Sequence, residues 1–536
     1  MRDEAHLRPR AANFRPLTPI DFLVHAADVS PARRAVVWRS RTWTWKEFET
    51  VVRRLVAVLK GHGIGSGDVV SVMCTNRPEM LAAHFAVPAL GAVLNCVNTR
   101  IDARDIAYIL RHSESRLLIA DPGCAVVAKV AVEDVGLPFE TIAEDGTNGD
   151  GLKLLGNGPA PEIDLLEAVT DEWQPIALNY TSGTTGNPKG VVLHHRGAWI
   201  NAMGNLTALG FTRETTYLWT LPMFHCNGWC HTWAITAAGG THVCLDKVEP
   251  QAVFDAIANH RVTHLSCAPV VLYMLVNSDA KETRDPAKRL TVATGGAAPT
   301  ASLIKAMDVL GFDFVHLYGL TECYGPTSIR ELDDAELSLD VEERAELLAR
   351  QGVRHLSANR IRVVDETGRD VPRDGKTVGE IVLAGNTLLA GYYRDAEETE
   401  KAFAGGGFRT GDLAAHHPDG HIEIKDRAKD VIITGGENVS SLEIESVLSR
   451  HPGVAIAAVV ARPDEKWGEV PMAFIEAKSG RPIDTAELEA FCRQHLAGFK
   501  MPRAWAFGEL PKTATGKIQK YQLRAAASRG ANEADA

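Results

Sequence analysis

The sequence predicts an α/β fold, with a large N-terminal domain of layered α/β sheets and a small α+β C-terminal domain. At 536 residues the chain is long enough for several folding units. Up to Thr377, short apolar runs alternate with segments of helical spacing, which is the pattern of α/β layers. After Thr377 the strands become short and are joined by Gly/Asp turns, and beyond Lys429 a compact α+β pattern follows.

Each strand of the large domain is predicted from a β-branched apolar run. Helices are predicted at Trp45–His62, which ends at Gly61 and Gly63, and at Pro250–His260, which begins at a proline. Parallel sheets packed between helices are the expected result. The predicted strands as far as the hinge region are Val69–Thr75, Arg116–Ala120, Ile176–Thr181, Tyr217–Leu221, Thr241–Leu245, Thr263–Ala268, Phe314–Leu317, Val378–Leu383, His421–Ile424 and Val431–Thr434.

A hinge is predicted within Lys425–Lys429, which gives a large domain at 1–425, a hinge at 426–429 and a small domain at 430–536. The small domain is expected to contain helices Ser441–Ser449 and Thr485–Leu496 and strands Ile456–Val460 and Met472–Ile475. The final segment, Ala525–Ala536, lacks periodic apolar residues and is expected to fray.

Composition and charge exclude several classes of protein. The net charge of −11 makes nucleic acid an unexpected partner, since binding it requires a basic surface. Met1–Pro19 has no apolar core of a secretory signal, and the most apolar window, Leu81–Leu94, is interrupted by His84 and Pro88, so no membrane span is expected. Nine scattered cysteines predict reduced thiols and a cytoplasmic protein.

The strongest local signal is a run of hydroxyls, glycines and one lysine after the apolar segment Ile176–Tyr180. Glycines allow the backbone to approach an anion, while hydroxyls and Lys189 add donors and charge, so the run predicts a phosphate cradle. An exposed Gly/Thr turn is the alternative. The run is not a Walker A loop, because Lys189 precedes Gly190, and Gly516-Lys517 precedes Ile518. Its residues are Thr181, Ser182, Gly183, Thr184, Thr185, Gly186, Asn187, Pro188, Lys189 and Gly190.

A second cluster, His225-Cys226-Asn227-Gly228-Trp229-Cys230-His231, invites a zinc interpretation. Structural zinc sites join two pairs of ligands, usually two to four residues apart, at one tetrahedral centre. The spacing here does not match this pattern, so zinc is not expected.

The ordered blocks of the chain resemble the adenylate-forming acyl-CoA synthetases, which share their fold with firefly luciferase and with the adenylation domains of peptide synthetases. The resemblance covers nearly the whole chain and implies a mobile small domain. It rests on the cradle and on Gly295-Gly296-Ala297-Ala298-Pro299, Tyr318-Gly319-Leu320-Thr321-Glu322, Thr410-Gly411-Asp412, Asp426-Arg427-Ala428-Lys429 and Pro511-Lys512-Thr513-Ala514-Thr515-Gly516-Lys517.

The resemblance implies a nucleotide site that uses ATP and Mg²⁺. Thr321 would contact the α-phosphate, Glu322 would help to hold Mg²⁺, Asp412 would accept hydrogen bonds from the ribose hydroxyls, and Arg427 would contact ribose or phosphate. The residues implied for the β- and γ-phosphates are Thr181, Ser182, Gly183, Thr184, Thr185, Gly186 and Lys189, and those implied for adenine are Gly296, Ala297, Ala298, Tyr318 and Gly319.

The resemblance also assigns the moving parts. Lys517 would bridge the acid and the α-phosphate during adenylation, and Lys429 would be the pivot of the hinge. The loop Gly435-Gly436-Glu437 would then replace Lys517 while coenzyme A enters.

His225 would lie near the adenylate carbonyl, with Trp229 and Trp233 beside the acyl tunnel; core packing is the alternative for both tryptophans. The polar His231 leaves a polar or branched acid open. Two bulky indoles disfavour long-chain fatty acids.

These implications predict an AMP-forming acid–thiol ligase that converts a carboxylic acid, ATP and coenzyme A to acyl-CoA, AMP and pyrophosphate. Within the family the chain looks closest to short- and medium-chain acyl-CoA ligases of fatty acid metabolism, including methylmercaptopropionate-CoA ligases. The alternatives are an aromatic or long-chain acyl-CoA ligase, a carrier-protein adenylating enzyme, a luciferase-like oxygenase and a non-catalytic nucleotide-binding protein. A homodimer is left open.

Overall fold

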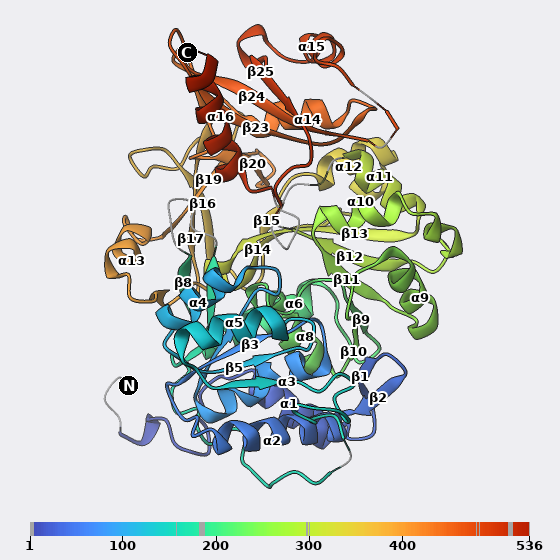
Figure 1. The fold of residues 1–536 in the computed structure, drawn as a ribbon, viewed down its shortest axis with the longest axis vertical. Coiled ribbons are helices and arrows are strands. Elements are labelled where there is room, and N and C mark those ends of the chain that lie inside the picture. Colours follow the sequence, from blue (N-terminus) through green and yellow to red (C-terminus); the bar gives the residue numbers. More distant parts are fainter. Residues whose placement is uncertain are drawn as a thin grey trace.

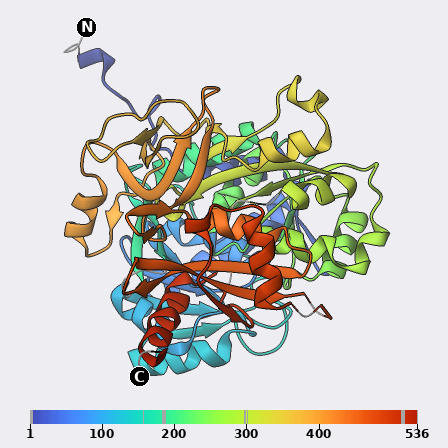
Figure 2. The ribbon, with the colours of Figure 1, turned by 90° about the horizontal axis from the view of Figure 1, so that it is seen from above.

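The computed structural model describes residues 5–156, 158–181, 188–295, 299, 301–478, 480–481, 483–512 and 518–534. It has a large lobe built on three sheets and a small lobe at one end of the long axis (Figure 1). Viewed from above, the small lobe overlies the large one (Figure 2). The predicted fold class is therefore confirmed.

A nine-stranded sheet forms one layer of the large lobe, in the order β15-β14-β13-β12-β11-β9-β10-β1-β2. Its centre, from β13 to β1, is parallel, as expected for strands that alternate with helices. The strands are β1 (Arg34–Trp38), β2 (Arg41–Thr44), β9 (Thr216–Trp219), β10 (Thr241–Cys244), β11 (His264–Cys267), β12 (Leu290–Thr294), β13 (Phe312–Leu320), β14 (Gly325–Arg330) and β15 (Val353–Arg354).

A seven-stranded sheet forms a second layer, in the order β18-β8-β7-β4-β3-β5-β6. Its strands are β3 (Val69–Met73), β4 (Val93–Cys96), β5 (Ser115–Ala120), β6 (Phe139–Thr141), β7 (Pro175–Thr181), β8 (Lys189–His194) and β18 (Gly391–Tyr392). The β7–β8 hairpin is antiparallel and pairs Thr181 with Lys189, so the two ends of the predicted cradle lie side by side.

Thirteen helices accompany these sheets among the described residues. Helix α2 starts with a capping box, in which Thr44 accepts from the Glu47 backbone N–H and Glu47 accepts from that of Thr44. A continuous buried apolar cluster includes residues of both large sheets. The helices are α1 (Ile20–Val29), α2 (Trp45–Gly61), α3 (Pro78–Ala86), α4 (Ala103–His112), α5 (Ala125–Val135), α6 (His195–Ala208), α7 (Cys226–Trp229), α8 (His231–Ala238), α9 (Pro250–His260), α10 (Pro269–Val276), α11 (Ala301–Val309), α12 (Val341–Leu348) and α13 (Ala396–Ala402).

A four-stranded antiparallel sheet completes the large lobe and leads to the hinge. Its strands, in spatial order, are β16 (Arg360–Val364), β17 (Val378–Ala384), β19 (Phe408–His416) and β20 (Ile422–Arg427). Strand β20 runs directly into the predicted hinge.

The small lobe packs helices on a five-stranded sheet and has apolar clusters of its own. Its elements are β21 (Ile432–Thr434), β22 (Glu437–Val439), α14 (Ser441–Ser449), β23 (Val454–Asp464), β24 (Gly468–Ala477), α15 (Thr485–Arg493), β25 (Ala504–Phe507) and α16 (Lys520–Ala534).

The expectation of a frayed end is wrong, because α16 continues to Ala534. Leu523 and Ala527 are buried in a cluster with Ala458 and Val460 of β23, so one short apolar stripe is enough to dock the helix. No helix within the described residues is both long and apolar enough to cross a membrane.

Candidate active site

The buried side chain of Asp412, the ribose-binding candidate, is held by contacts with a tyrosine and an arginine. The Tyr318 hydroxyl donates to Asp412 Oδ2 at 2.7 Å, and Arg427 Nε lies 2.9 Å from Asp412 Oδ1. Asp412 is 2% exposed, while Arg427 is partly exposed. Each carboxylate oxygen keeps a lone pair for a further donor, so the group can accept from a ribose diol. The structure thus brings Tyr318 to Asp412 and Arg427, which are cross-strand partners in the β19–β20 hairpin.

Burial and charge set the protonation of this group of residues. Burial raises the pKa of the Tyr318 phenol well above its usual value, and the neighbouring Asp412 adds to the effect. Burial alone would lower the pKa of Arg427, but Asp412 and Tyr318 outweigh it. Tyr318 therefore stays a donor and Arg427 a cation at any physiological pH.

The close packing of the β13–β14 hairpin explains the glycine beside Tyr318. A Cβ on Gly319 would lie 1.9 Å from the carbonyl oxygen of Gly325 on the facing strand. Any larger residue would push the strands apart, so Gly319 fixes the position of Tyr318 and of the 3₁₀ turn Thr321–Cys323 that follows.

The magnesium candidate Glu322 has a partner that the sequence analysis missed. Tyr392 of β18 donates its hydroxyl to Glu322 Oε1 at 3.0 Å, and the same ring lies 5.3 Å from Lys189 Nζ. Lys189 also pairs with Glu398 Oε1 at 2.6 Å. Tyr392 thus connects the base of the phosphate cradle to the metal candidate, and the Gly-Tyr dipeptide after a turn is the only sequence signal for it.

Burial raises the pKa of Glu322, and the nearby Asp412 adds to this effect, while the hydrogen bond from Tyr392 and the charge of Arg427 oppose it. A buried carboxylate that is disfavoured in its charged form is stabilised by a cation, and Mg²⁺ prefers carboxylate and phosphate oxygens. The residues present therefore fit a magnesium ion at Glu322.

The segment after His225 adopts a rare left-handed turn. Five successive residues, 226–230, have positive φ, between 42° and 60°, although only Gly228 among them is a glycine. A left-handed conformation costs about 1–2 kcal/mol per non-glycine residue, so the surrounding contacts must hold it. Asn179 Nδ2 donates to Asn227 Oδ1 at 2.5 Å, and Cys230 Sγ donates to the Tyr324 carbonyl at 3.1 Å.

This turn places the Trp229 side chain against the predicted adenine motif. A Cβ on Gly295 would lie 2.9 Å from Trp229 Cη2, so the indole packs directly on that glycine. Cys226, at the other end of the turn, contacts Thr321 Oγ1 at 3.2 Å through Sγ. His225 precedes the turn and is half-buried. The predicted acyl-site and phosphate-site residues therefore meet here.

Trp233 and His231 lie deeper in the core than Trp229. Trp233 is fully buried, and its Nε1 donates to the His84 carbonyl at 3.4 Å. His231 is also fully buried, and its Nδ1 forms a 3.0 Å hydrogen bond with the Tyr217 hydroxyl. Burial lowers the pKa of His231 to about 3, so it is neutral. The His231 ring lies edge-on to the Trp229 indole, with 6.1 Å between ring centroids, whereas Trp233 packs against His84 and Tyr324.

The hinge candidate Lys429 lies at the surface just after β20. Partial burial of its ammonium lowers its pKa to about 8, and the neighbouring Arg427 adds to this effect. The predicted coenzyme A loop is the β21–β22 turn, where Gly435 and Gly436 have φ of 60° and 89° and Glu437 is exposed. Glycine suits both positions because the turn needs positive φ.

Several predicted site residues lie outside the described residues. These are Ser182, Gly183, Thr184, Thr185 and Gly186 of the cradle, Gly296, Ala297 and Ala298 of the adenine motif, and Lys517.

Comparison with known proteins gives the family. A model described as "AMP-binding enzyme" matches residues 23–393, and one described as "AMP-binding enzyme C-terminal domain" matches residues 443–517. The chain belongs to the AMP-binding enzymes. The predicted resemblance is confirmed: the chain is an AMP-forming acyl-CoA synthetase, and like others of this kind it uses ATP, Mg²⁺ and coenzyme A.

The relatives and solved structures extend over the whole chain. An acetate/butyrate–CoA ligase of Arabidopsis thaliana, named as peroxisomal, is 44% identical over 553 residues, covering 98% of this chain and 96% of the relative. A peroxisomal trans-cinnamate:CoA ligase of Petunia hybrida is 41% identical over 540 residues, covering 96% and 94%. The ATP-bound MatB structure from Rhodopseudomonas palustris has a TM-score of 0.83 at 28% identity, covering 95% and 98%.

Proposed function

We propose that this synthetase activates short- and medium-chain carboxylic acids, methylthio-alkanoic acids among them. The observation that carries the proposal is the Trp229 indole, which the left-handed turn presses against Gly295. A large rigid ring at this point would close the acyl pocket early, and the buried His231, edge-on to the indole, limits how far the ring can withdraw.

The first half-reaction joins the carboxylate of the acid to the α-phosphorus of ATP and releases pyrophosphate. Asp412, oriented by Tyr318 and Arg427, would hold the ribose, and Glu322 would hold Mg²⁺, which when bound would neutralise charge on the phosphates. Lys189, at the start of β8, would bind the β- and γ-phosphates, and Thr321 would contact the α-phosphate. Lys517 lowers the repulsion between the two anionic reactants.

The second half-reaction transfers the acyl group from the adenylate to the thiol of coenzyme A and releases AMP. His225 precedes the strained turn and would lie near the adenylate carbonyl. We place the pivot at Lys429, between a large domain at 1–425 and a mobile small domain at 430–536, with 426–429 as the hinge. Rotation exchanges Lys517 for the Gly435-Gly436-Glu437 turn, whose backbone allows close approach of pantetheine.

The exchange predicts that the two half-reactions separate in one variant. Lys517→Ala should abolish ATP–pyrophosphate exchange while conversion of supplied acyl-adenylate to thioester stays within about threefold of wild type. Lys512→Ala, a lysine of the same segment that pairs with Glu476 at 2.8 Å, is the control and should affect neither half-reaction. Equal losses in both half-reactions would contradict the alternating role of Lys517.

A panel of C2 to C12, branched, methylthio and aromatic acids, scored for AMP and acyl-CoA, tests the choice of acid. The panel includes cinnamate because one relative is named for that acid. Greatest kcat/KM on acids of up to about eight carbons supports the proposal; greatest kcat/KM on cinnamate or on C12 contradicts it.

We further propose a place for the enzyme in fatty acid metabolism and a cytoplasmic location. All nine cysteines are free thiols, as in a reducing compartment. Two relatives are named as peroxisomal, so fractionation of the source cells should compare both compartments. We also propose that the protein forms a homodimer. Light scattering at micromolar concentration, which gives the molar mass in solution, tests this.

A further inference from the structure

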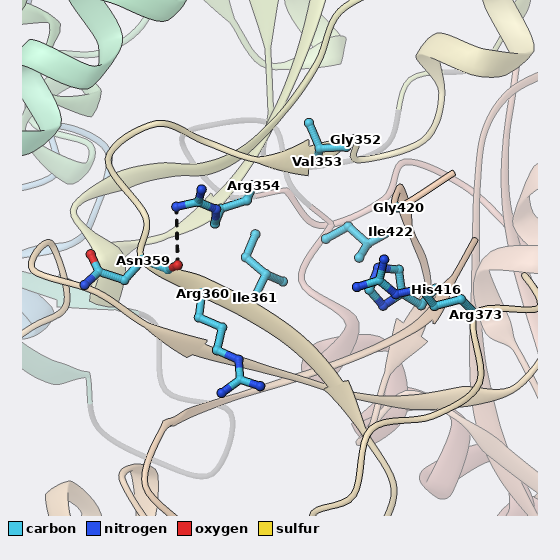
Figure 3. Close-up of a pocket in the computed structure, with 10 residues that line it drawn as sticks. All are labelled: Gly352, Val353, Arg354, Asn359, Arg360, Ile361, Arg373, His416, Gly420 and Ile422. Atoms are coloured by element: carbon cyan, nitrogen blue, oxygen red, sulfur yellow. Dashed lines mark hydrogen bonds between the residues drawn. The ribbon is translucent and has the colours of Figure 1, made fainter. Parts of the chain in front are cut away.

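A short segment between α12 and β15 joins the nine-stranded sheet to the four-stranded sheet. Gln351, in this segment, is 3% exposed and belongs to no helix or strand. Its backbone N–H donates to Ile422 O at 3.1 Å, and Ile422 N donates to Gly352 O at 2.8 Å. Figure 3 shows Gly352 and Ile422 lining one hollow at this junction. The segment therefore pairs with β20, the edge strand of the four-stranded sheet.

The Gln351 side chain continues this pairing along β20. Ile424 N donates to Gln351 Oε1 at 2.5 Å, so a side-chain amide oxygen takes the place of a backbone carbonyl at the edge of the sheet. A backbone N–H that is shielded from water needs such an acceptor. Ile424 lies three residues before Arg427, so Gln351 holds β20 close to its end at the nucleotide site.

The same segment is fixed to the nine-stranded sheet on its other side. Ser328 Oγ of β14 donates to Gln351 O at 2.6 Å, and Ser328 is the cross-strand partner of Tyr318. A Cβ on Gly352 would lie 2.0 Å from the Ile329 carbonyl oxygen, and Gly352 has a φ of 79°. Glycine thus allows the segment to lie directly against β14.

Strand β13 also contacts this segment. His316, two residues before Tyr318, has its Nδ1 at 3.1 Å from Leu348 O and at 2.9 Å from Arg350 O. Both partners are acceptors, so Nδ1 carries the hydrogen and donates. Residues 348–352 therefore contact β13, β14 and β20 at the same time.

The three candidates of the ribose site lie on strands of the two sheets that this segment joins. Tyr318 is in β13, while Asp412 and Arg427 are cross-strand partners in the β19–β20 hairpin, so these two move together. The Tyr318 hydroxyl donates to Asp412 Oδ2 at 2.7 Å across the gap between the sheets. Hydrogen bonds of this kind span about 2.5–3.0 Å, so a shift of the hairpin by about half an ångström would break the contact.

We propose that Gln351 is a positioning residue for the nucleotide. It holds the β19–β20 hairpin, and with it Asp412, at hydrogen-bond distance from Tyr318, and itself touches neither ATP nor the acid. This role rests on the proposed ribose-binding role of Asp412. Gln351→Met keeps the length of the side chain and removes the acceptor of the Ile424 N–H, which frees β20 to shift.

The readout is the ratio of kcat/KM for ATP to kcat/KM for 2′-deoxy-ATP in pyrophosphate exchange by the full chain. This ratio measures recognition of the ribose hydroxyl and does not depend on the fraction of active enzyme. Asp412→Asn should lower the ratio about tenfold or more, because a neutral amide is a weaker acceptor than a carboxylate. Gln351→Met should lower it about threefold or more, because Asp412 is no longer held in place.

Two further variants accompany this comparison. Gln251→Met changes an exposed glutamine of α9 and should leave the ratio as in wild type. Ser328→Ala removes the hydroxyl that binds Gln351 O and should also lower the ratio. It decides the outcome by the same criterion if Gln351→Met does not fold.

The failure of the ribose assignment and the failure of the positioning role give different results. If Asp412→Asn keeps the wild-type ratio, the ribose assignment is wrong and the role of Gln351 fails with it. If Asp412→Asn lowers the ratio but Gln351→Met changes kcat/KM by the same factor for both nucleotides, the ribose assignment stands and the positioning role is overturned.

Discussion

Lys520, the first residue of α16, connects the start of this helix to the interior of the small lobe. Its Nζ lies 2.7 Å from Glu445 Oε1 and donates to Ser441 Oγ at 2.7 Å. Both members of the ion pair are largely buried, with 15% of each side chain exposed. Burial alone would lower the pKa of Lys520, but Glu445, Asp430 and Asp426 outweigh it and raise the pKa above its ordinary value.

Lys520→Met keeps the length of the side chain and removes its charge. Glu445 would keep one described partner, the Val459 backbone N–H at 2.7 Å, and would remain buried without a cation. Breaking a buried pair from one side costs about 3–5 kcal/mol. The Met side chain retains most of the packing, and Glu445 can take up a proton, so we expect a loss of about 3 kcal/mol at pH 8.

The loss should shrink as pH falls. Without its lysine, Glu445 has a folded-state pKa raised above its unfolded value, because burial already raises it in the intact pair. A raised carboxyl pKa means that the folded state binds the proton more tightly, so lowering the pH stabilises the variant relative to pH 8. Lys520→Met combined with Glu445→Gln should recover most of the loss, since no buried charge remains.

Urea unfolding at pH 6 and pH 8 measures the change in the free energy of unfolding. Hydrogen exchange in residues 441–449 and 520–527 shows whether the small lobe is the part affected. The matched control is Lys500→Met, which removes a 2.7 Å pair with Glu443 on the same helix α14. This pair is more exposed, so its loss should cost about 1 kcal/mol or less. The reasoning is refuted if the two lysine variants lose equal stability, or if the Lys520 variant is equally destabilised at both pH values.

Two further substitutions test the site itself. Glu322→Gln should abolish ATP–pyrophosphate exchange. At a pH above 7 it should also raise the melting temperature of the ligand-free protein, because a carboxylate with a raised pKa destabilises the fold when it is ionised. An unchanged or lower melting temperature would contradict this. Trp229→Ala should shift the best substrate toward longer acids, with kcat/KM on C10 rising relative to C4 by tenfold or more, because the vacated indole volume accepts several methylenes. Trp173→Ala, an exposed tryptophan, should leave the C10 to C4 ratio of kcat/KM unchanged.

The sequence predicted the elements whose apolar spacing is regular. Helices Pro250–His260 and Ser441–Ser449 have the expected bounds, and helix α2 ends one residue earlier than expected. The C-terminal helix was missed because it is docked by one short apolar stripe, Leu523 and Ala527, and not by a long amphipathic face. Tertiary contact with β23 therefore decides whether this segment is ordered.

For the candidate site, motifs supplied the candidate residues, while the contacts between them came only from the structure. Tyr318 was expected to offer its ring to adenine, yet its hydroxyl also orients Asp412 across 94 positions of sequence. Tyr392 and Glu322 are likewise 70 positions apart. Spacing along the chain carries no information about such pairs. The left-handed turn at 226–230 could not be predicted from the sequence either, because a single glycine among five residues does not indicate five positive φ angles.

Hydrogen bonds join the two sides of the segment in which we propose the hinge. Asp426 lies before Lys429 in β20, yet its Oδ2 accepts from the Ser441 backbone N–H at 2.6 Å and from Ser441 Oγ at 2.8 Å. Ser441 begins α14 and also accepts from Lys520. If the small lobe rotates about Lys429, as we propose, Ser441 moves away from Asp426 and these hydrogen bonds must break. Because Asp426 is only 2% exposed, its carboxylate would then need water or a new hydrogen-bond donor. This cost would create an energy barrier between the two proposed orientations of the small lobe, which would make them discrete states.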